Sequence, residues 1–480
     1  MTTASVSLSP AGPGLLIAVT GAPGSGKTQL LAALAAEKPH AEGFLAVAQA
    51  RAATGIGAQS YSLRLLAMAE ELPWCERDAS VSPPYRFDPA TRARLIEWAK
   101  ALKPHPPLLL LDEFGKFEAR GEGLMPLWPE ITRAQPGIVV LAVRSGLEAE
   151  IGKQLGQRFD LRIDAAAPEA LAQLRRACAD FGEWTQLGLV GGASGAVELS
   201  LGSALHAAKL PFRGTLMASV QAAMMVYAGR GLTQPGRVVW VPFISAGLKA
   251  LSPAGNRLRP MVAIVMQGLL FGSAVQLGGW RASAVVLGGA FVGAWAAAQG
   301  FFLQWLLLGD ELMRAYDAAV VWLADKLHLT APALPWIVGG WTVLSALVAA
   351  GASLVAWQLR APPAALQRII DRAPLVSTKP ATGWRSRGRE FTRWQFWFPL
   401  LVVAAIMLAG GRPWASVGWL TLRFFAVACV LMALLSLLRP AHWPVFLRAR
   451  GWWGPAVALS GALARGAAQK SSPKSSFNRE

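Results

Sequence analysis

The chain has 480 residues, of which 54% are hydrophobic, and a formal net charge of +18. Residues 1–185 hold 19 Lys and Arg against 20 Asp and Glu, whereas residues 186–480 hold 27 against 8. Because the excess positive charge lies between long apolar stretches, as in the cytoplasmic loops of membrane proteins, the composition argues against a nucleic-acid partner. Residues 1–11 have neither the basic start nor the apolar core of a signal peptide, and we expect a flexible, cytoplasmic N-terminus.

A glycine-rich loop follows the first apolar run of the chain. Residues 15–20 have the length of a buried strand, and residues 29–37 are rich in Leu and Ala, which favours a helix. The loop between them reads Gly21-Ala22-Pro23-Gly24-Ser25-Gly26-Lys27-Thr28. Strand, glycine loop and helix in this order are typical of a Walker A motif, which binds the phosphates of a nucleoside triphosphate.

Each residue type in this loop has a chemical reason to be there. Gly21, Gly24 and Gly26 permit backbone angles that side chains disfavour, so that N–H groups of the loop can point at phosphate oxygens. We predict that Lys27 binds the β- and γ-phosphates and has a catalytic role, and that Thr28 binds Mg²⁺.

An acidic pair follows another apolar run. Residues 108–111 are four leucines, which predict a strand, and Asp112 and Glu113 come directly after it. This arrangement resembles a Walker B motif. We expect Asp112 to hold Mg²⁺ and Glu113 to orient or deprotonate a water that attacks the γ-phosphate. The alternative for Glu113, a solvated residue after a strand, stays open.

Residues 12–180 alternate between predicted strands and helices. Further strands are predicted at 44–47 and 137–143, and a helix at 89–102. This alternation predicts an α/β domain with a parallel sheet between helices, with its ligand at the carboxyl ends of the strands. Arg144 ends the last strand, where it contacts phosphate or is an ordinary surface residue.

Three stretches together resemble one P-loop family, the nucleoside triphosphatases often described as nucleotide phosphatase/kinases. They are residues 21–28, residues 43–63, and Asp112-Glu113-Phe114-Gly115-Lys116-Phe117-Glu118. The resemblance implies hydrolysis of ATP or GTP with Mg²⁺, a hairpin across the second stretch, and Arg51 and Glu118 as further site residues. Gln49 replaces a Glu of the family pattern, and residues 55–58 lack its second basic residue and its aromatic residue. A transporter ATPase of the ABC type is disfavoured, because no Leu-Ser-Gly-Gly-Gln run precedes Asp112.

Apolar stretches with the length of a membrane span recur after residue 186. They predict an all-α polytopic domain of about 8 transmembrane helices, six in residues 187–359 and two in 396–438. The predicted spans are 187–206, 212–229, 236–251, 260–279, 282–308, 333–358, 396–411 and 416–438.

Charge predicts the orientation of these spans. The loop 360–395 and the tail 439–480 are strongly basic, which places both in the cytoplasm. The expected location is therefore the inner (cytoplasmic) membrane, multi-pass, with the N-terminal domain and the C-terminus inside and the lipid bilayer as a partner. Lys249, Arg257 and Arg259 conflict with this count, because it puts their loop outside.

Two features of the second part concern function. Glu198 lies in the first predicted span, and an acid within the membrane is a candidate site residue, although a helix before the membrane is an equal alternative. The charged residues between Asp310 and Lys326 have helical spacing, which predicts an amphipathic helix on the membrane surface.

The membrane part also resembles the S-components of energy-coupling-factor vitamin transporters. The resemblance rests on six spans and on two short stretches, Leu210-Pro211-Phe212-Arg213-Gly214 and residues 253–261. It implies uptake of a vitamin- or metal-type solute, together with other transporter subunits. Three hypotheses follow: NTP hydrolysis linked to small-molecule transport, a nucleoside triphosphatase tethered to the membrane, and a slow nucleotide-dependent switch.

Overall fold

The structure is a computed structural model, which describes residues 13–51, 58–68, 70–80, 85–207, 212–250, 258–327, 333–359, 364, 394–437 and 443–471. The chain divides into two compact units. One consists of Met1–Trp184 together with Val445–Val457, and the other of Thr185–Pro444 together with Ala458–Glu480.

The first unit contains an eight-stranded sheet with the order β5-β4-β3-β2-β6-β7-β1-β8. Its strands are β1 (Leu15–Gly21), β2 (Glu42–Arg51), β3 (Ala58–Leu65), β4 (Glu71–Arg77), β5 (Tyr85–Phe87), β6 (Leu108–Phe114), β7 (Ile138–Arg144) and β8 (Leu161–Asp164). β2, β6, β7, β1 and β8 run parallel, as predicted. The strands β3, β4 and β5 extend β2 antiparallel, so the sheet is mixed and not wholly parallel.

Helices cover both faces of this sheet, and on each face an apolar cluster lies between the sheet and the helices. On one face lie α2 (Pro89–Ala101), α3 (Trp128–Ala134) and α4 (Glu148–Gln154), with the alternate strand residues Leu109, Leu111, Val139 and Leu141. On the other face lie α1 (Lys27–Glu37) and the start of α5 (Ala170–Ala207), with Leu108, Leu110, Ile138 and Val140. Alternation along a strand turns successive side chains to opposite faces, which explains why the central strands are apolar throughout.

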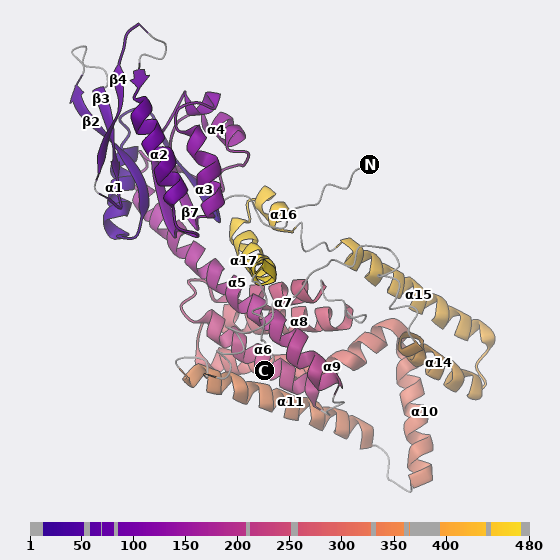
Figure 1. The fold of residues 1–480 in the computed structure, drawn as a ribbon. Coiled ribbons are helices and arrows are strands. Elements are labelled where there is room, and N and C mark those ends of the chain that lie inside the picture. The colour runs from indigo at the N-terminus through magenta and orange to yellow at the C-terminus, as the bar shows by residue number, and fades with distance from the viewer. Residues whose placement is uncertain are drawn as a thin grey trace, which may run out of the picture. The chain divides into compact units, whose positions relative to one another are not determined.

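The second unit is helical (Figure 1). It contains the later part of α5, then α6 (Arg213–Gly229), α7 (Trp240–Ala250), α8 (Leu258–Gly278), α9 (Ala282–Leu308), α10 (Asp310–Leu327), α11 (Ala333–Gln358), α14 (Trp394–Ala409) and α15 (Trp414–Leu437). The helices α16 (Trp443–Ala449) and α17 (Trp453–Ser471) follow α15 in the chain. The predicted helix between Asp310 and Lys326 is present as α10.

The prediction of about eight spans is not supported. Among the described residues three helices are long and apolar enough to cross a membrane, at Pro260–Gly278, Ala282–Phe302 and Gly339–Gln358. The predicted span 236–251 contains only an 11-residue α-helix, α7, which is about 16 Å long against about 30 Å of hydrocarbon. The apolar parts Leu400–Ala409 of α14 and Trp414–Val427 of α15 are also shorter than a span.

Two further predicted spans, 187–206 and 212–229, are also not among the candidate spans, for other reasons. Residues 187–206 belong to the 38-residue helix α5, whose Gly, Ser and Glu198 make it less apolar than a span. Residues 212–229 form the 17-residue helix α6, which starts only at Arg213. The predicted N-terminal segment 1–11, most of the basic loop 360–395 and the loop with Arg257 lie outside the described residues. The tail after residue 439 contains the helices α16 and α17.

Candidate functional site

The glycine loop joins β1 directly to α1, as the sequence predicted. β1 ends at Gly21 and α1 begins at Lys27, with Gly26 before it in the left-handed region at φ 88°. Gly24 is also left-handed, at φ 79°. Gly21 has a different reason to be glycine, since a Cβ there would overlap the Ser25 side chain. The loop therefore makes a tight turn into the N-terminal end of α1, where the first backbone N–H groups have no partner within the helix.

Lys27 folds back over this loop. Its Nζ donates hydrogen bonds to the carbonyl oxygens of Gly21, at 2.9 Å, and of Ala22, at 2.8 Å. Burial lowers its pKa, an effect that the nearby carboxylates Glu113 and Asp112 oppose and the charge of Arg144 reinforces. The ammonium of Lys27 therefore lies within electrostatic reach of both acids and of Arg144.

Asp112 is a buried carboxylate held by three donors. Its Oδ2 accepts the N–H of Ala46 at 3.1 Å, its Oδ1 accepts the N–H of Glu113 at 2.9 Å, and Thr28 gives a side-chain hydrogen bond. Burial raises its pKa, while these hydrogen bonds and Lys27 lower it. The contact with Thr28 joins the two predicted metal-binding residues, one from α1 and the other from β6.

Glu113 has an unusual backbone for a residue inside a strand. Its φ is +66°, and the pairing of β6 with β7 shifts register between Leu111 and Phe114. Non-glycine residues at positive φ carry strain and concentrate at functional sites. The bulge leaves the residue accessible to solvent between two buried neighbours. Protein groups around its carboxyl group nevertheless displace much of its water, and this desolvation, followed by repulsion from Asp112 and Glu118, raises its pKa to about 7.

Three further predicted site residues of the first unit, Arg144, Glu118 and Arg51, lie at the ends of strands or in the turn after β6. Arg144 ends β7 and pairs in register with Gly21, so it stands beside the loop with an exposed side chain. The Glu118 carboxylate is buried and accepts the N–H groups of Gly115, at 2.8 Å, and Leu124, at 3.0 Å. Those contacts give Glu118 a structural task in the turn after β6. Arg51 is the last residue of β2.

Sequence reasoning missed two features of this site. The first is the Ala46 N–H, which holds Asp112 from the adjacent strand β2; a backbone group leaves no signal in the sequence. The second is a polar cluster across β2, β3 and β4, in which Gln49 Nε2 donates to Ser62 Oγ at 3.2 Å and to Glu71 Oε1 at 3.0 Å. Ser62 also hydrogen-bonds Glu71, and these bonds lower the pKa of Glu71.

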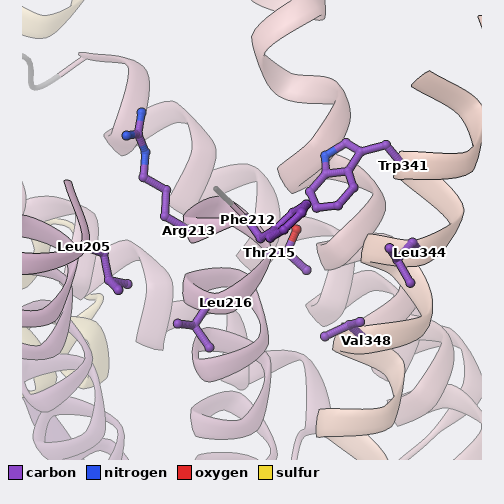
Figure 2. Close-up of a pocket in the computed structure, with 8 residues that line it drawn as sticks. All are labelled: Leu205, Phe212, Arg213, Thr215, Leu216, Trp341, Leu344 and Val348. Carbon is purple, nitrogen blue, oxygen red and sulfur yellow. The ribbon is translucent and has the colours of Figure 1, made fainter. Parts of the chain in front are cut away.

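The second unit contains a separate apolar pocket of about 380 Å³ (Figure 2). The residues that line it are Leu205, Phe212, Arg213, Thr215, Leu216, Trp341, Leu344 and Val348. The rings of Phe212 and Trp341 lie 4.7 Å apart at one side, and Thr215 and Ser345 share a 2.8 Å hydrogen bond between hydroxyls. Glu198 is not among the lining residues; its carbonyl oxygen lies 3.5 Å from Lys249 Nζ.

No protein-family model, curated protein or solved structure matches the chain. No family is therefore identified, and both resemblances stay predictions. Within the described residues, no group of three or more His, Cys, Asp and Glu side chains gathers as a metal site would. Thr28 and Asp112 supply two oxygen donors, which is the small protein share that Mg²⁺ takes when phosphates and water provide the rest.

Proposed function

We propose that the chain is a membrane-bound, Mg²⁺-dependent P-loop nucleoside triphosphatase, which converts ATP or GTP to the diphosphate and phosphate. One observation carries the proposal: Lys27 and Thr28 at the start of α1 meet Asp112 and Glu113 at the end of β6, beside the open amide end of that helix. A cation, a hydroxyl, a held carboxylate and a second acid are the groups that phosphate binding and water attack require.

The fit to a phosphate ligand has independent support from Ser25. Its Oγ is buried within the glycine loop and has no hydrogen-bond partner among the described residues. A buried hydroxyl without a partner needs an explanation, and a phosphate oxygen in the loop would supply one. Lys27 now bonds to two loop carbonyls, which ligand oxygens would replace.

Each residue then has a stated task. The loop N–H groups and Lys27 bind the triphosphate, Thr28 and Asp112 bind Mg²⁺, and Glu113 accepts a proton from the attacking water. Mg²⁺, when bound, supplies charge neutralisation at the phosphates. Purified protein in liposomes, given ATP or GTP with Mg²⁺, tests the proposal by phosphate release; no release and no nucleotide binding would reject it.

A link to transport of a small molecule is the finer part of the proposal. It is supported by the pocket between α5, α6 and α11, whose lining is largely apolar and includes Phe212 and Arg213 of the stretch that resembles a transporter S-component. Apolar pockets of this size commonly hold small organic ligands. A solute that raises hydrolysis in liposomes would support the link, and hydrolysis unaffected by any solute would favour the tethered enzyme.

The rate of hydrolysis should depend on pH through Glu113. A base works only when deprotonated, and its pKa is raised to about 7. We therefore expect kcat/KM to rise as pH increases from about 6 to about 8, with a midpoint near the pKa of Glu113. The measurement is the pH profile of kcat/KM beside that of Glu113→Gln. An identical acid limb in both proteins would assign the titration to another group, such as the nucleotide.

The chain should cross the membrane an even number of times. Residues 445–457 belong to the same compact unit as the α/β domain, so the chain must return to the side of the membrane where that domain lies. The three candidate spans found in the described part of the chain are an odd number, and we expect a further crossing outside them. Single cysteines at the exposed positions Glu122 and Arg450 should react with an impermeant maleimide in the same vesicle orientation. Opposite labelling of the two would contradict this topology.

A further inference from the structure

Residues 445–457, here called the latch segment, follow α15 in the chain, yet they pack on the N-terminal α/β domain. The latch segment contains most of α16 and the first residues of α17. Arg448, Trp453 and Gly454 are among the residues that make the contact. Nothing in the sequence predicted this contact, because the residues that it joins are more than 250 positions apart.

Arg448 makes the polar part of the contact. Its guanidinium donates to the carbonyl oxygen of Gly14 and, at 3.4 Å, to that of Pro13. Its Nε lies 3.8 Å from Oδ1 of Asp160, whose side chain is only 5% exposed. The other oxygen of Asp160 accepts the N–H of Leu16 at 3.0 Å. The Arg448 side chain therefore holds the beginning of β1, both directly and through Asp160.

Burial raises the pKa of Asp160, and the charge of Arg448 lowers it. A buried carboxylate that loses its cation is strongly destabilising, because water cannot replace the partner. Asp160 also lies at the start of β8, where its own N–H donates to the carbonyl of Leu16 at 2.9 Å. Loss of Arg448 would consequently disturb the pairing of β8 with β1 as well as the first residues of β1.

The apolar part of the contact is close. Trp453 packs against the core cluster on the α1 side of the sheet, which includes Leu15 and Ile17 of β1. Gly454 lies directly against Trp184, so that a Cβ at residue 454 would overlap the indole ring. A cation on a buried acid and a tryptophan on the core together specify one docked position for the latch segment.

We propose that the latch segment regulates the glycine loop by fixing the root of β1, the strand whose other end is that loop. The inference rests on the proposed function, because it concerns the same nucleotide site. β1 has seven residues, all paired with β7 and four of them also with β8, which gives a stiff connection of about 20 Å between Arg448 and the loop. The chain leaves the α/β domain through α5 and returns to it in the latch segment. Residues 185–444 of the helical unit are thus joined to this domain at both ends, so that a movement of these residues would reach the root of β1.

The test uses the full chain in lipid nanodiscs, with Mg²⁺ and ATP or GTP as probes. Arg448→Ala should speed hydrogen exchange in residues 445–457 and lower hydrolysis about fivefold, at the small end of coupling between sites. Arg448→Lys, which keeps the charge, should restore most of the rate. Arg450→Ala is the matched control, because Arg450 is an exposed neighbour that stacks on Phe446.

A second variant guards against simple loss of folding. In Asp160→Asn with Arg448→Met no unpaired charge remains, so thermal stability should recover while hydrolysis stays low. Faster exchange with normal hydrolysis in the Arg448 variants would overturn the regulation, and unchanged exchange would overturn the docking. A wild-type chain that neither binds nor hydrolyses ATP or GTP would reject the proposed function instead, and the exchange result would still decide whether the latch segment is docked.

Discussion

Glu113→Gln should reduce hydrolysis by about 10²- to 10⁴-fold, which is the usual contribution of a positioned general base. The amide keeps the size and the hydrogen-bonding reach of the carboxyl but cannot accept the proton of the attacking water. Because Lys27, Thr28 and Asp112 keep their contacts, nucleotide binding should stay within about twofold of wild type. Single-turnover phosphate release and fluorescent-nucleotide titration measure the two quantities separately.

The matched control for this substitution is Glu122→Gln. Glu122 lies in the turn after β6, nine residues from Glu113, and is exposed. Its removal should leave both hydrolysis and binding unchanged. Full turnover in Glu113→Gln would show that another group activates the water, and the positive φ of Glu113 would then need a structural explanation.

The α/β half of the chain could largely be predicted, because its signals are local. The apolar run 15–20, the glycine loop and the helix after it are consecutive in sequence, and the chemistry of Lys27 depends on that order alone. The antiparallel extension β3 to β5 was not predicted beyond a hairpin. Its strands alternate polar with apolar residues, and Ser62 of β3 and Glu71 of β4 hydrogen-bond each other and Gln49 of β2, so that they lack the apolar run of a central strand.

The features that sequence reasoning could not reach depend on long-range contacts or on backbone shape. The bulge that turns Glu113 out of β6 arises from the pairing with β7, and the latch segment joins residues far apart in the chain. The helical half was overestimated for a different reason. Apolar composition marks a span only when the helix is long enough, and helix length depends on where turns such as the one before Trp240 interrupt it.

Lys27→Ala should weaken nucleotide binding about 10- to 100-fold, since hydrogen bonds from a charged donor contribute roughly 1.5–3 kcal/mol each. The reason is specific to this loop, because the ammonium of Lys27 lies among Asp112, Glu113 and the loop carbonyls. Without this ammonium, the negative charges of the two acids would repel the triphosphate. The charge of Lys27 also lowers the pKa of Glu113, so the remaining activity should need a higher pH.

Lys38→Ala is the control for this substitution, because Lys38 ends the same helix at an exposed position and faces no acid of the site. Titration of ATP and GTP by calorimetry gives the affinity, and the pH profile of the residual rate gives the shift at Glu113. The two readouts separate two roles of one ammonium. A loss of affinity without a shifted profile would confine Lys27 to the phosphates, whereas unchanged affinity would reject the glycine loop as the nucleotide site.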